Sequence, residues 1–192
     1  LALHPESPAP SIPTVADSDM PPSILISEVR RTVRRFPLGS GPGPSGLRAA
    51  HLQAFFRCPA VDPSHELAAC CDRLVNGALP IVMRPYFYGA RLLALGKLSG
   101  GLRPIACGEV LRRLAAKILC ARAKTSASDL FVRMAQMGVA VRGGAEAMTH
   151  AARRLVTSWR TSGNRHRVLV KIDFQNAFNT VDRATILEKV AT

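Results

Sequence analysis

The chain has 192 residues, 47% hydrophobic and 20% charged, a composition typical of a globular protein rather than a disordered one. Its 26 lysines and arginines against 13 aspartates and glutamates give a formal net charge of +13, which favours a polyanionic partner, either nucleic acid or an anionic membrane surface. No apolar run approaches the ~20 residues of a membrane-spanning helix, and the first residues, LALHPESPAP, lack the features of a secretion signal.

The ends and the cysteines set further expectations. The sequence has no initiator Met and its last residues, ILEKVAT, have a helical pattern, so we expect a piece of a longer protein. Five cysteines without a CxxC pair suit reduced thiols, which predicts an intracellular protein, nuclear or cytoplasmic, that is not secreted. His51, Cys58, His65 and Cys70 are spaced more widely than compact zinc-ligand pairs, so zinc is a minor alternative.

The first predicted helix is strongly basic. It follows a proline-rich segment, residues 1–22, that reads as a linker or a disordered arm. Ser27 is expected to cap the helix, and Val29, Val33 and Phe36 have helical spacing. The opposite face carries Arg30, Arg31, Arg34 and Arg35. A solvated basic face and a contact with nucleic-acid phosphates are both consistent with this pattern.

Residues 37–47, PLGSGPGPSGL, are too rich in proline and glycine for a regular element. They read either as a flexible connector or as a loop in which Ser45 caps a helix over residues 47–57 and offers free backbone N–H groups to an anion. Ser64 is expected to cap the next helix, which ends at Gly77.

A β-hairpin is predicted over residues 89–106, with Ser99-Gly100-Gly101 as a three-residue turn. That turn would place Leu98 opposite Leu102. It would also place Lys97 opposite Arg103, and the side chains of these two cations would share one face of the hairpin. Two cations held side by side repel each other unless an anion lies between them. The alternatives are therefore a solvated hairpin tip and a phosphate site.

A long basic helix is predicted from Glu109 to Lys124, and a further helix from about Ala145 to Trp159. The outer face of the first carries Arg112, Arg113, Lys117, Arg122 and Lys124. A membrane-surface helix has a similar pattern but usually has aromatic anchors, which this one lacks. The glycines at 138–144 match neither a Walker loop nor GxGxxG.

Near the end, residues 167–174 are predicted to form a strand that ends in an acid. Period two places Val168, Val170, Ile172 and Phe174 on one face and Asp173 on the other. An aspartate at a strand end can serve as a local cap or as a ligand at an open cleft.

Four segments in this order resemble the N-terminal part of a reverse transcriptase domain of the non-LTR retrotransposon and group II intron type. GPGPSGLRAAHL (41–52) is similar to the family's Pro-Gly-x-Asp-Gly segment, and LGKLSGGLRPIACGEVLRRLAAKIL (95–119) resembles its fingers hairpin and following helix. QMGVAVRGGAEAMTH (136–150) is similar to the Gln-x-Gly block, and KIDFQNAFNTV (171–181) to the first palm motif.

This resemblance implies an α+β fold: mainly helical fingers with a β-hairpin, leading into the first strand of an incomplete right-hand polymerase palm. Residues 1–22 would be the arm, 23–166 the fingers and 167–192 the start of the palm. The implied activity is RNA-directed DNA synthesis by two-metal nucleotidyl transfer. The implied partners are an RNA template, a DNA primer and deoxynucleoside triphosphates, with no membrane. A non-catalytic nucleic-acid-binding remnant is the alternative.

The resemblance also implies residue roles. Asp173 would be the catalytic, metal-binding aspartate, with the Phe174 backbone carbonyl assisting a second Mg²⁺. Lys97 and Arg103 would bind the triphosphate, while Ala177 and Phe178 would lie against the sugar of the nucleotide. Gln136 would touch the template or the nucleotide pocket. The expected contacts to the nucleic-acid backbone are Arg30, Arg31, Arg34, Arg35, Arg112, Arg113 and Lys117.

The sequence departs from the family pattern in three places. Ser45 stands where the family usually has Asp, and Asn176 and Asn179 replace residues that are often acidic. No two of the seven aspartates are adjacent, so the second palm motif, an aromatic-x-Asp-Asp, is absent from these residues, as is the thumb. We therefore expect these 192 residues alone to be inactive as a polymerase.

Overall fold

The computed structural model describes residues 22–98, 100–163, 166–174 and 177–191. It divides into two compact units, one formed by Pro21–Arg142 and the other containing the chain from Gly143 onward. Mostly helical, with one antiparallel hairpin, the chain has the expected α+β fold. The assignment of fingers and palm to residue ranges stays a prediction.

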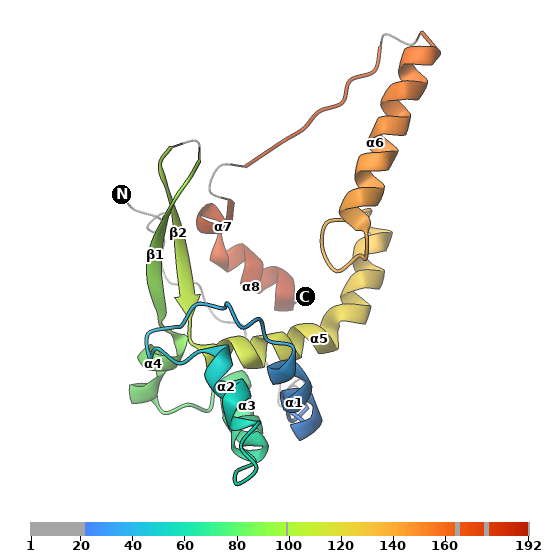
Figure 1. Cartoon of the computed structure of the whole chain (residues 1–192). Helices are drawn as coiled ribbons and strands as arrows, with labels where there is room; N and C mark the ends of the chain where they lie inside the picture. The colour runs from blue at the N-terminus through green and yellow to red at the C-terminus, as the bar shows by residue number, and fades with distance from the viewer. Residues whose placement is uncertain (1–21, 99, 164–165, 175–176, 192) are drawn as a thin grey trace. The chain divides into compact units, whose positions relative to one another are not determined.

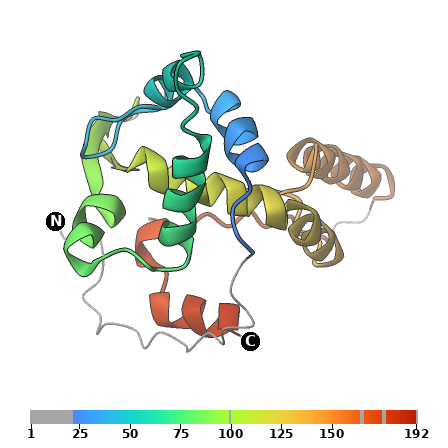
Figure 2. The ribbon, with the colours of Figure 1, turned by 90° about the horizontal axis from the view of Figure 1, so that it is seen from below.

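The larger unit is built around one long helix. Its elements are α1 (Ile26–Arg34), α2 (Ala49–Phe55), α3 (Ser64–Val75), the 3₁₀ turn η2 (Ile81–Met83), α4 (Arg84–Tyr88), β1 (Ala90–Gly96), β2 (Leu102–Gly108) and α5 (Val110–Arg133). Helices α1 and α3 pack against α5 and against each other (Figures 1 and 2). The core lies where they meet, around Val29, Val33, Cys71, Leu114 and Ile118. The apolar positions predicted for these helices are therefore the ones that are buried.

Helix α5 is longer than predicted, because it continues past Lys124 to Arg133. Val110, Leu114 and Ile118 are fully buried, whereas no residue beyond Ile118 in this helix is. The second half therefore has no buried apolar stripe. Because the helix was predicted from such a stripe, its predicted end came too early.

Two predicted helix caps are wrong in detail. Helix α1 begins at Ile26, so Ser27 lies inside its first turn, and the Glu28 carboxylate accepts a hydrogen bond from the Leu25 N–H at 2.9 Å. Helix α3 begins with Ser64 itself, and the Ser64 N–H donates to the Asp62 carboxylate at 3.2 Å. In both cases a nearby carboxylate takes the N–H, because a charged acceptor binds a free helix N–H more strongly than a hydroxyl does. The end of α3 is as expected, with Gly77 at a φ of 64°.

The hairpin forms with a register two residues away from the predicted one. Leu95 pairs with Arg103 and Gly96 with Leu102, and the turn closes with a hydrogen bond from the Lys97 N–H to the Gly101 carbonyl at 3.0 Å. Lys97 is thus diagonal to Arg103 rather than opposite it. Gly100 and Gly101 both have a φ of 86°, so both glycines occupy positions that only glycine adopts readily. An even shift preserves the faces, and both cations remain on the same one.

The second unit contains α6 (Gly144–Thr161), α7 (Ala177–Thr180) and α8 (Arg183–Ala191). Asp182 caps α8 by accepting bonds from the Ala184 and Thr185 N–H groups, each at 3.2 Å. The strand predicted for residues 167–174 is wrong, because these residues form neither a helix nor a paired strand. A strand needs a neighbour to bond with, and among the described residues the two paired strands pair only with each other.

Candidate functional site

The hairpin tip presents two cations to solvent. Lys97 and Arg103 are both exposed, and the register puts them on one face as diagonal neighbours. Diagonal positions across a ladder have Cα atoms roughly 7–8 Å apart, which long side chains span easily. Arg91 is on the same face near the root of the hairpin, opposite Cys107. The arrangement is open to an anion at the tip.

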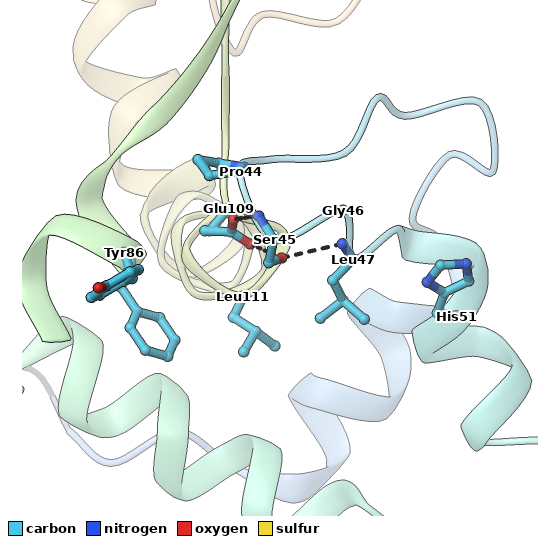
Figure 3. A pocket seen from close by; sticks show the side chains of 9 residues that line it. Pro44, Ser45, Gly46, Leu47, His51, Tyr86, Glu109 and Leu111 are labelled. Atoms are coloured by element: carbon cyan, nitrogen blue, oxygen red, sulfur yellow. Dashed lines mark hydrogen bonds between the residues drawn. The ribbon is translucent and has the colours of Figure 1, made fainter.

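Glu109 holds the loop of residues 37–47, for which the sequence allowed either a flexible connector or an ordered loop. Glu109 is 6% exposed, and its carboxylate accepts bonds from the Ser45 N–H at 2.6 Å and from the Ser45 hydroxyl at 2.7 Å (Figure 3). The Ser45 oxygen also accepts a bond from the Leu47 N–H at 3.2 Å. Helix α2 begins only at Ala49, so Ser45 fastens the loop rather than capping that helix. Sequence reasoning missed Glu109, and its position just before α5, where acids are favoured, was the one available signal.

Beside this loop lies a cavity of about 800 Å³. Leu47, Phe87 and Leu111 contribute apolar walls, and the exposed rings of His51 and Tyr86 lie at opposite sides (Figure 3). Both carboxylate oxygens of Glu109 already accept hydrogen bonds from Ser45. The cavity is therefore suited to binding an apolar or aromatic group and not to acid–base chemistry by Glu109.

The arginines expected to contact nucleic acid fall into two groups. Arg30 is paired with Asp62, and its Nε donates to the Ser64 hydroxyl at 3.1 Å. Arg112 donates to the Tyr88 carbonyl at 2.8 Å and Arg113 to the Gly41 carbonyl at 2.6 Å. These side chains are built into the fold. Arg31, Arg34 and Arg35 are exposed and make no side-chain hydrogen bond or ion pair with the residues that the structure describes.

Lys117 differs from both groups. Its ammonium lies over the ring of Phe36, 5.0 Å from the centroid, and the Arg113 guanidinium lies 5.6 Å from the same centroid. The ring favours both cations in this position, which orients them without neutralising their charge. Lys117 itself is exposed and thus open to a partner.

The residues assigned to the palm belong to the second unit. Asp173 is exposed, and the Phe174 side chain is 75% exposed. Ala177 is half-buried at the start of α7, and the side chain of Phe178 lies outside the described part of the structure. Gln136, in the larger unit, is exposed and accepts a bond from the Gly138 N–H at 2.7 Å.

The donor chemistry at Asp173 fits part of a magnesium site. A carboxylate and a backbone carbonyl are the oxygen ligands that Mg²⁺ prefers. Within the described residues, however, no group of three or more His, Cys, Asp or Glu side chains is placed to hold a metal. Asp182 is engaged at the start of α8, where the Thr185 hydroxyl lowers the pKa of its carboxyl. Among the described residues, Asp173 is thus a single potential ligand and not a metal site by itself.

The cysteines differ in exposure: Cys58 and Cys120 are exposed, whereas Cys71 is buried. All five cysteines are free, and burial raises the pKa of the Cys71 thiol to about 12, so this thiol is unreactive. None of the described helices combines the length and apolarity needed to cross a bilayer.

The structure thus defines an α+β chain with a cationic hairpin tip and an exposed arginine face. No protein-family model matches the sequence. The sequence is 29% identical over 169 residues to the "Retrotransposable element SLACS 132 kDa protein" of Trypanosoma brucei gambiense. The alignment covers 88% of this chain and 13% of that protein. The chain is therefore distantly related to a retrotransposon protein and spans a small part of its length.

Proposed function

We propose that this chain is the fingers and the beginning of the palm of a reverse transcriptase domain, acting within a longer protein. The observation that carries the proposal is the order of the four reverse-transcriptase-like segments in a chain related to a retrotransposon protein. The exposed hairpin with Lys97 and Arg103 at its tip supports the proposal, because a fingers hairpin has to present cations to a triphosphate.

In this function each residue has a limited task. Lys97 and Arg103 neutralise and orient the triphosphate, since phosphoryl transfer depends on alignment and charge stabilisation more than on covalent help. Asp173 and the Phe174 carbonyl offer oxygen ligands to Mg²⁺, which when bound neutralises the charge that develops on the phosphate. Ala177 and Phe178 lie against the sugar, and Gln136 touches the template or the nucleotide pocket. The partners are an RNA template and a DNA primer.

A second function, binding nucleic acid without catalysis, is favoured by one observation. The described residues place no second carboxylate with Asp173, whereas the basic surface needs no further part of the protein. Such a remnant would keep its affinity for RNA and have no polymerase activity.

The test is primer extension on an RNA template by a protein that joins this chain to the residues encoded after it. Asp173→Asn removes the ligand charge and keeps the size of the side chain, so extension should be lost. The matched control is Asp182→Asn, because asparagine also caps helices and Asp182 serves α8. Extension that survives Asp173→Asn contradicts the catalytic role, and a wild-type protein that binds RNA without extending a primer supports the remnant.

A further inference from the structure

The outer face of α1 is a groove lined by Ser27, Arg30, Arg31, Arg34 and Arg35, with a volume of about 480 Å³. Arg30 and Arg34, and likewise Arg31 and Arg35, are four residues apart, so each pair of side chains starts from Cβ atoms about 6 Å apart on the same side of the helix. Like charges at this spacing destabilise an isolated helix. The groove therefore concentrates positive charge on one face of α1.

The contacts separate the arginine that belongs to the fold from those that do not. Arg30 is tied to Asp62 and Ser64, in the segment that leads into α3. Arg122, across from the start of α1, binds the Glu28 carboxylate at 2.7 and 2.9 Å and the Ser23 carbonyl at 2.8 Å. Arg31, Arg34 and Arg35 have no such side-chain bond to any described residue, so their donors face solvent.

The helix that carries these three side chains is held firmly at both ends. Glu28 binds the Leu25 N–H at the start, and the Gln53 side chain donates to the carbonyls of Val33 and Phe36, each at 2.9 Å, at the end. Those carbonyls would otherwise leave the negative end of the helix dipole exposed beside Arg34 and Arg35. The backbone that carries the arginines is therefore held in place before a ligand arrives, and the remaining entropic cost of binding is the ordering of the side chains themselves.

The apolar face of α1 decides between the two kinds of anionic surface. An interfacial helix inserts its apolar side into the bilayer. Here Val29 and Val33, on that side, are 0% and 1% exposed because they pack in the core. The groove itself is lined only by a serine and arginines. A phosphate chain in water can reach this face, whereas a bilayer would meet no apolar group in the groove to anchor the helix.

We propose that Arg31, Arg34 and Arg35 form a phosphate track that binds the backbone of single-stranded RNA without reading its sequence. Arg30, Arg112 and Arg113 are structural and contribute little to the binding. The choice of RNA as the polyanion rests on the proposed function, whereas the division of the arginines rests on their contacts alone. Phe36 follows Arg35 in the chain, and the Lys117 ammonium lies over its ring. Lys117 therefore extends the positive surface onto α5.

The experiment measures binding of the full chain to a labelled mixed-sequence RNA oligonucleotide between 0.05 and about 1 M salt. One variant carries Arg31→Gln, Arg34→Gln and Arg35→Gln. The charge-matched control carries Arg48→Gln, Arg73→Gln and Arg142→Gln, which are all exposed and lie outside the groove. Losing three single-strand phosphate contacts should make the negative slope of log K against log salt shallower by about 2 and weaken binding about 100-fold at 0.1 M salt. The control should stay within a few-fold of wild type.

Two further variants keep the test decisive. Replacing the three arginines by lysines should preserve the salt slope, because lysine also neutralises a phosphate. Arg30→Gln should leave the slope unchanged, because the Arg30 side chain is already engaged by Asp62 and Ser64. The track would be overturned if the triple glutamine variant and its control lost the same RNA affinity, or if the triple lysine variant bound RNA as weakly as the glutamine variant. It would also be overturned if the glutamine variant lost binding to phosphatidylserine vesicles but not to RNA.

RNA binding and primer extension separate this proposal from the proposed function. The track predicts that Asp173→Asn binds RNA as wild type does, whether or not the longer protein extends a primer. Failure of extension with an intact arginine-dependent salt slope would refute the polymerase and leave the track standing. Extension that depends on Asp173, with no arginine-dependent slope, would refute the track alone.

Discussion

Ser45 and Glu109, 64 residues apart in sequence, are joined by two hydrogen bonds, of 2.6 and 2.7 Å. One comes from the Ser45 backbone and one from its hydroxyl, so each carboxylate oxygen of Glu109 has a donor. Because Glu109 directly precedes α5 and follows β2, this pair fastens the Gly- and Pro-rich loop to the root of the hairpin. A serine at this position suits the buried acid beside it, because its hydroxyl and its N–H each donate to one carboxylate oxygen.

Replacing Ser45 tests this match. Ser45→Ala removes one charge-assisted bond and should lower the free energy of unfolding by about 1–2 kcal/mol. Ser45→Asp should cost more, because it places a second carboxylate against the buried one of Glu109. Ser45→Thr keeps the hydroxyl and is the control. Urea unfolding at neutral pH measures the order, and an aspartate variant as stable as wild type would contradict the account.

Gly43 is expected to tolerate no side chain. A Cβ there would lie 2.7 Å from the Glu109 Cα and 2.8 Å from its N, which are backbone atoms that cannot move aside. Gly43→Ala should therefore cost about 1–3 kcal/mol, as overpacking does. Gly39→Ala in the same loop meets no atom within 4 Å and should be neutral or slightly stabilising. Thermal unfolding of the two variants side by side makes the comparison, and equal stabilities would refute the packing at Gly43.

The pair of Glu28 and Arg122 should make the stability depend on pH. The hydrogen bond from Arg122 holds the pKa of the Glu28 carboxyl below its ordinary value of 4.5. A lowered folded-state pKa means that the stabilisation is complete above about pH 4.5 and is lost as the pH falls through the folded-state pKa. Acid therefore weakens the attachment of α1 to α5.

Glu28→Gln should lower the free energy of unfolding by about 2 kcal/mol at pH 7 and flatten the pH dependence below pH 4.5. Glu146→Gln is the matched control, because the side chain of Glu146 is 79% exposed and lies 3.8 Å from His150. Such surface pairs contribute little. Denaturant unfolding at pH 7 and pH 3.5 gives both numbers. If the two variants lose the same stability at pH 7, Glu28 does not hold α1 to α5.

Arg103 should matter for nucleotide binding in the longer protein. Arg103→Ala removes a charge-assisted contact to the triphosphate, and the KM for deoxynucleotides should rise about 10- to 100-fold. Arg91→Ala is the control, since Arg91 is on the same face of the hairpin but opposite Cys107, away from the tip. Steady-state kinetics on an RNA template compares the two, and equal KM values would exclude a special role for the tip.

Local patterns in the sequence were sufficient for most of the secondary structure. The spacing of Val29, Val33 and Phe36 predicted a helix and the side on which it is buried. Gly77 marked the end of α3. These features depend on neighbours within a few residues, which the sequence displays directly.

Contacts between residues far apart in the sequence could be identified only in the tertiary structure. The sequence could not tell that Arg30, Arg112 and Arg113 are held by Asp62, Tyr88 and Gly41 while Arg31, Arg34 and Arg35 face solvent, because each partner lies 24 to 72 residues away. The composition of the turn is compatible with either register of the hairpin. In the structure the turn closes between Lys97 and Gly101, with Gly100 and Gly101 both at positive φ. Residues 167–174 alternate like a strand, but a strand forms only where another backbone supplies its hydrogen bonds. Periodicity thus determined which faces are apolar, and only the packing of distant segments determined which charges remain available to a partner.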